Sequence, residues 1–72
     1  MKFVKYLSMV NKVSSIEGQK EQVKGRQDLI EKHVRRGDIS EDDSRLQLAS
    51  YSRELRDLEH EKRTVIRHYL AA

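Results

Sequence analysis

This 72-residue chain contains no cysteine, so a site for a transition metal would have to be built around its three histidines. His60-Glu61 begins the pattern His-Glu-x-x-His, in which two imidazoles one turn apart on a helix bind zinc. The position of the second imidazole is occupied by Thr64, His68 lies two turns from His60, and His33 is distant in the sequence. The spacing therefore predicts histidines on a surface or in an interface, and no metal site.

The other groups that could take part in catalysis lack partners at a suitable spacing. The chain has no glycine-rich phosphate loop, and Ser50 and Ser52 have no plausible adjacent base to activate them. Asp42-Asp43 is explained better by the start of a helix, where negative charge is favourable, than by acid–base chemistry. We therefore expect a protein that is not an enzyme, needs no cofactor and acts by binding.

The clearest structural boundary is a turn at residues 37–40. Basic residues crowd the region before it, Gly37 can adopt the left-handed conformation that ends a helix, and Ser40 can cap the next one. Acidic residues fill the first turn from Glu41, which complements the helix dipole. Because the connection is short, the flanking helices should run antiparallel as a hairpin.

The first helix of the hairpin is predicted over residues 14–36. Ser14 and Glu17 form a capping box at its start. Residues 1–13 have two adjacent apolar faces and are expected to form a short helix packed on the hairpin or to stay flexible, and Met9 could serve as an alternative start. The apolar stripe of the first helix is thin, with large aliphatic residues seven positions apart: Ile16, Val23 and Ile30.

The second helix, predicted over residues 41–70, carries the strongest pattern in the chain. Its apolar residues alternate three and four positions apart, which is the spacing of a coiled coil, with one polar interruption at Lys62. The sequence thus predicts an all-α, coiled-coil-like, antiparallel two-helix hairpin over residues 14–72. The pattern is formed by Leu48, Tyr51, Leu55, Leu58, Val65 and Tyr69, and Ile66 widens it.

This stripe is broader than the first helix can cover. Ordering each residue costs roughly 1.5 kcal/mol, and fully burying a large aliphatic side chain stabilises by roughly 1.5–3 kcal/mol, so a hairpin with one seam should be marginally stable alone. An uncovered apolar patch marks a binding surface. We expect a second protein chain, or residues 1–13, to cover these candidate partner-binding residues: Leu48, Tyr51, Leu55, Leu58, Val65, Ile66 and Tyr69.

The net charge of +3, from 15 basic and 12 acidic residues, could suit a nucleic acid. By segment the charge is +3 over residues 1–13, +2 over residues 14–36 and −2 over residues 37–72, with both signs mixed in the two longer segments. A surface that follows phosphates needs a stripe of one sign, so nucleic acid is not an expected partner. A membrane surface is not expected either, because the basic, apolar segment 1–13 is short.

The hairpin corner Arg35-Arg36-Gly37, the long helix from Glu41 and its basic-aromatic end Val65-Ile66-Arg67-His68-Tyr69 resemble the small helical-hairpin co-chaperones of type III secretion needle subunits, the YscE, PscE and EscE kind. The resemblance covers residues 14–70 and lies in architecture and composition, without a diagnostic motif. The acidic turn and the added segment 1–13 depart from it.

The resemblance implies a bacterial, cytoplasmic protein. Such a protein would bind a tetratricopeptide-like chaperone and, through it, help to keep a needle subunit soluble before export. The residues also allow a different class, a homodimeric helical-hairpin regulatory protein such as a phage could encode, which would act by binding a second copy of itself.

Overall fold

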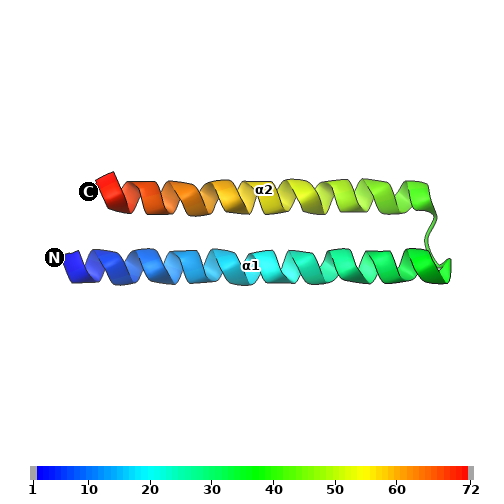
Figure 1. Ribbon diagram of the computed structural model, residues 1–72, viewed down its shortest axis with the longest axis horizontal. Coiled ribbons are helices and arrows are strands. Elements are labelled where there is room, and N and C mark those ends of the chain that lie inside the picture. The colour runs from blue at the N-terminus through cyan, green and yellow to red at the C-terminus, as the bar shows by residue number, and fades with distance from the viewer. Residues whose placement is uncertain (1, 72) are drawn as a thin grey trace.

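The computed structural model describes residues 2–71, which form two long helices joined by a short turn (Figure 1). Helix α1 spans Lys2–Arg36 and helix α2 spans Glu41–Ala71. The helices lie side by side and antiparallel, so the start of α1 and the end of α2 share one end of a rod of 55 × 15 × 9 Å. The predicted all-α two-helix hairpin is confirmed.

Helix α1 begins at Lys2, about three turns before the start predicted at Ser14. Residues 2–13 are the first turns of α1 rather than a separate helix packed on the hairpin. Glu17, expected to cap a helix start, instead lies 2.8 Å from the amine of Lys62 on α2. The helix continues because the alternation of seam residues extends toward its start through Val13, Met9 and Tyr6.

The turn between the helices forms as the sequence predicts. Gly37 has a φ of 77°, its N–H donates to the carbonyl of Val34 at 3.0 Å, and the N–H of Asp38 donates to the carbonyl of His33 at 2.9 Å. These two bonds are the Schellman arrangement that satisfies the last carbonyls of a helix. At the start of α2, the hydroxyl of Ser40 accepts a 3.2 Å hydrogen bond from the N–H of Asp43, so the predicted N-cap is confirmed.

The core is a single seam between the two helices. Ile16, Val23, Ile30 and Leu58 are its buried apolar side chains, and none of the side chains described in residues 2–71 is completely enclosed. Two helices cover each other along one line only, so both flanks of the seam stay open to solvent. Packed against the buried cluster, but only partly buried themselves, are Tyr51, Leu55 and Val65.

We predict that Leu58→Ala destabilises the hairpin by about 2 kcal/mol, because it removes a buried side chain that α1 covers. The matched control is Leu46→Ala, which should change the free energy of unfolding by less than about 0.5 kcal/mol, since Leu46 is 73% exposed. Urea denaturation followed by circular dichroism measures both. Equal losses in the two variants would contradict the position of the seam.

A second prediction concerns the turn. Gly37→Ala should destabilise the hairpin by about 1 kcal/mol, because an L side chain is strained at its positive φ. Gly25→Ala should instead stabilise it by about 0.5–1 kcal/mol, since Gly25 is helical and a Cβ added there meets nothing within 4 Å. Thermal unfolding that moves in the same direction for both variants would be inconsistent with this turn.

Candidate interaction surface

Four charged side chains form a network across the seam. The amine of Lys20 lies 2.7 Å from Glu59 and 3.6 Å from Glu17, and the amine of Lys62 lies 2.8 Å from Glu17. The side chains of Lys20 and Lys62 are 16% and 29% exposed, so their apolar stems lie in the seam while the charged ends reach carboxylates at its edge. Two of the three contacts join α1 to α2.

This network specifies how the two helices align. Glu17 lies three residues before Lys20 on α1, and its partner Lys62 lies three residues after Glu59 on α2. The two pairs therefore fit the same antiparallel alignment of the helices. A slide of one heptad would preserve the apolar alternation but would bring Ser52 or Ile66 to the place of Glu59. Polar side chains in a coiled-coil seam select one register in this way.

The network also shifts the ionisation of its members. The close ion pair with Lys62 lowers the pKa of Glu17, with a further contribution from the charge of Lys20. The bond between Lys20 and Glu59 lowers the pKa of Glu59 and raises the pKa of Lys20. Each shift favours the charged form, so the network is intact where both carboxyl groups are ionised.

Two grooves follow one another along one long side of the hairpin, which we call the groove side. The larger, of about 390 Å³, lies between the first turns of α1 and the last turns of α2, and the smaller, of about 190 Å³, lies near the middle. Both expose edges of the seam at their floor. The floor residues are Met9, Val65 and Tyr69 in the larger groove and Val23 and Leu58 in the smaller.

The rims of the groove side follow a seven-residue spacing, which keeps residues of a coiled-coil helix on one face. The rim on α1 carries positive charge and the rim on α2 carries mainly negative charge. On α1 the rim residues are Lys5, Lys12, Gln19 and Arg26, and on α2 they are Glu54, Glu61 and His68.

The structure divides the predicted partner-binding residues among several places. Leu58 is buried with an edge on the smaller groove, and Val65 and Tyr69 line the larger groove. Tyr51 and Leu55 pack against the core. The remaining two, Leu48 and Ile66, are half-buried and line neither groove.

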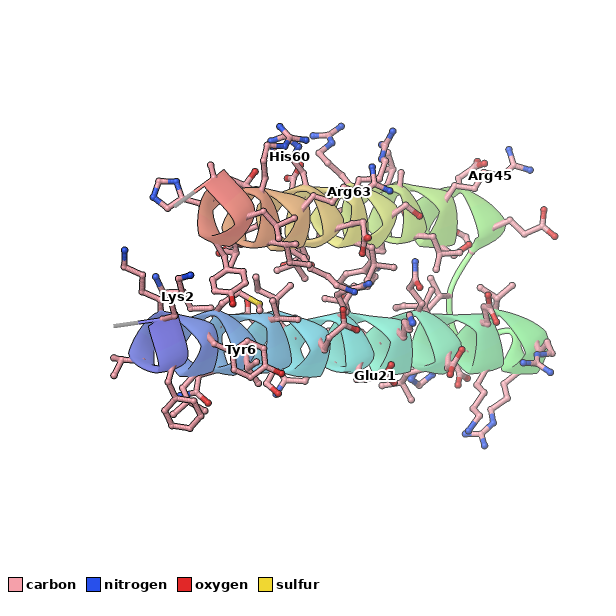
Figure 2. The ribbon with its side chains drawn as sticks, turned by 60° about the vertical axis from the view of Figure 1, so that its left-hand side comes forward. Lys2, Tyr6, Glu21, Arg45, His60 and Arg63 are labelled. Atoms are coloured by element: carbon pink, nitrogen blue, oxygen red, sulfur yellow. The ribbon has the colours of Figure 1, made fainter. Side chains whose placement is uncertain are left out.

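The first turns of α1 lie beside part of the α2 stripe, but as a continuation of α1 rather than as the separate segment expected to pack on the hairpin. The ring of Tyr6 lies 6.1 Å from the ring of Tyr69 at an interplanar angle of 59°. His60 and Arg63, by contrast, project from the side of α2 that faces away from α1 (Figure 2).

The sequence interpretation missed Lys20 and Gln27 as seam residues, although they continue the three-four alternation between the buried aliphatic residues.

Within residues 2–71, no group of three or more His, Cys, Asp and Glu side chains is placed to hold a metal ion. No helix in the same range has the length and apolar character needed to cross a bilayer. Comparison with known proteins finds no matching family model, no matching curated protein and no matching solved structure.

We predict that the hairpin loses stability in acid through this network. Because folding lowers the pKa of Glu17 and Glu59, their stabilising contribution is present above their ordinary pKa of 4.5 and is lost as pH falls through the lower folded values. Urea midpoints measured from pH 7 to pH 2 check this. The double variant Glu17→Gln/Glu59→Gln should show a flatter profile, and an unchanged acid slope in that variant would contradict the assignment.

Proposed function

We propose that the protein is a helical co-chaperone or adapter that binds a helical segment of another protein chain on its groove side. The observation that carries the proposal is the open seam, whose apolar edges form the floor of two consecutive grooves. A helix laid in these grooves would cover the floor and complete a bundle, with its own apolar residues at positions i, i+3, i+4 and i+7.

The rims indicate what such a partner would look like. Lys5, Lys12 and Arg26 border the grooves on α1, and Glu54 and Glu61 border them on α2. A partner helix with acidic residues along one edge and basic residues along the other would pair with both rims. Such complementarity sets the orientation and the association rate of a partner more than its affinity.

The proposed partner class is a tetratricopeptide-like chaperone of a bacterial type III secretion system, in the cytoplasm. This part of the proposal is supported by the resemblance of the corner Arg35-Arg36-Gly37, the helix from Glu41 and the basic-aromatic end 65–69 to needle-subunit co-chaperones. By mass action, a hairpin that stabilises the chaperone would increase the share of needle subunit held soluble before export.

A second candidate is a homodimeric regulatory protein, and the opposite charge of the two rims favours it. Two copies packed groove side to groove side, with α1 of one copy over α2 of the other, would place basic rim against acidic rim. The product would be a four-helix bundle with two-fold symmetry. Its melting temperature would rise with protein concentration.

We predict that filling the grooves abolishes partner binding and leaves the hairpin folded. Ser8→Trp and Gln22→Trp place a large side chain at exposed groove positions and should weaken binding at least about tenfold. Ser14→Trp and Ser52→Trp, at exposed positions that line neither groove, are the matched controls. Circular dichroism should give the same helix content for all four variants.

The measurement combines two assays. Sedimentation equilibrium over a range of concentrations detects the homodimer, and co-expression with candidate tetratricopeptide-like chaperones followed by size exclusion detects the complex. A partner complex or a dimer that the groove variants lose and the controls keep supports the proposal. A monomer at every concentration that binds none of the chaperones, or binds them equally in all variants, would overturn it.

A further inference from the structure

The hairpin brings together two parts of the sequence that carry positive charge alone. Residues 2–16 and 62–71, which we call the open end, contain no Asp or Glu, and all 12 acidic residues lie between residues 17 and 61. The sequence argument against membrane binding considered residues 1–13 by themselves, whereas antiparallel packing places the last turns of α2 beside them (Figure 1). The basic residues of the open end are Lys2, Lys5, Lys12, Lys62, Arg63 and Arg67.

The open end also exposes large apolar side chains. Phe3 is 70% exposed, Val4 is 59% exposed and Leu70 is 75% exposed, with Leu7 and Tyr6 at 43% and 47%. These five residues come from the first two turns of α1 and the last turn of α2, so they lie together at the end of the rod. Basic residues next to exposed Phe, Leu and Tyr are typical of surfaces that enter a bilayer interface.

The positions of these side chains distinguish the open end from the groove side, because they line neither groove. Successive residues of a helix point about 100° apart, so Phe3, Val4 and Leu7 share one face of α1, and Leu70 adds an exposed apolar side chain from α2. None of the three lines a groove, so a helix bound on the groove side would leave them exposed. A bilayer interface covers all of them at once because it surrounds whatever enters it, and a nucleic acid would leave the apolar side chains without a role.

We propose that the open end docks on a bilayer that contains anionic phospholipid. Phe3, Val4 and Leu70 would enter the interface, and Lys2 and Arg67 would lie among the headgroups. Lys12 and Arg63 lie about 10–15 Å further along the helix axes, where the surface potential is largely screened at about 0.1 M salt, and Arg63 also lies 3.7 Å from Glu59. The acidic remainder of the hairpin would point away from the negative surface, so the separation of charge would also orient the rod.

The test is flotation of the whole chain with vesicles. One set of vesicles is phosphatidylcholine, and in the other roughly a third of the lipid is phosphatidylglycerol. The protein should float with the anionic vesicles, and its binding should weaken between about 50 and 200 mM salt. Lys2→Gln/Arg67→Gln should lower binding more than tenfold, since each cation near the surface contributes about fivefold. Phe3→Ser/Leu7→Ser should also lower it at least about tenfold.

Matched controls carry the same changes away from the open end. Lys32→Gln/Arg53→Gln removes two exposed charges, and Leu29→Ser/Leu46→Ser removes two exposed apolar side chains. Both should bind within about twofold of the original chain, and circular dichroism checks that every variant is folded. No binding to anionic vesicles, equal binding to both kinds of vesicle, equal losses in the controls, or binding to duplex DNA but to neither kind of vesicle would each overturn the proposal.

Discussion

The ion pairs Lys20–Glu59 and Glu17–Lys62 are the contacts on which the rest of the hairpin depends. The seam contains few buried apolar side chains, and a seven-residue repeat alone would allow the helices to slide by a heptad. A slide would break both pairs between the helices and take Glu17 away from Lys62, and unpaired charge in a partly buried position is costly. The network therefore converts a thin, repetitive seam into one alignment.

That alignment determines which surfaces the protein presents. It brings Met9 beside Val65 and Tyr69, so that their edges form the floor of the larger groove. It also places the basic first turns of α1 next to the last turns of α2 at the open end. The same register thus generates both the groove side that we propose for a helical partner and the basic, apolar end that we propose for an anionic lipid surface.

The turn and the helix type could be predicted from the sequence because local chemistry determines them. Gly37 and Ser40 end one helix and start the next through bonds within a few residues. The start of α1 could not be predicted, because Ser14 and Glu17 have the pattern of a helix cap while the folded chain uses Glu17 to pair with Lys62 across the hairpin. That pairing depends on the alignment of two distant segments.

The candidate surfaces, too, could be predicted from the sequence only in part. The seam of α2 followed from its three-four alternation, but its partner stripe on α1 was underestimated because Lys20 and Gln27 interrupt it with polar side chains. The sequence analysis therefore assigned α1 too small a share in covering the stripe of α2. The charge of the open end could not be seen in either segment alone, since it arises only when residues 2–16 lie beside residues 62–71.

The most direct test of this account is a double-mutant cycle on Lys20 and Glu59, measured as the free energy of unfolding at low salt. If the pair aligns the helices, Lys20→Gln and Glu59→Gln should each destabilise the hairpin, and the double variant should lose clearly less than the sum of the two. Losses that simply add would show that the two side chains do not interact, and would contradict the register on which both proposed surfaces depend.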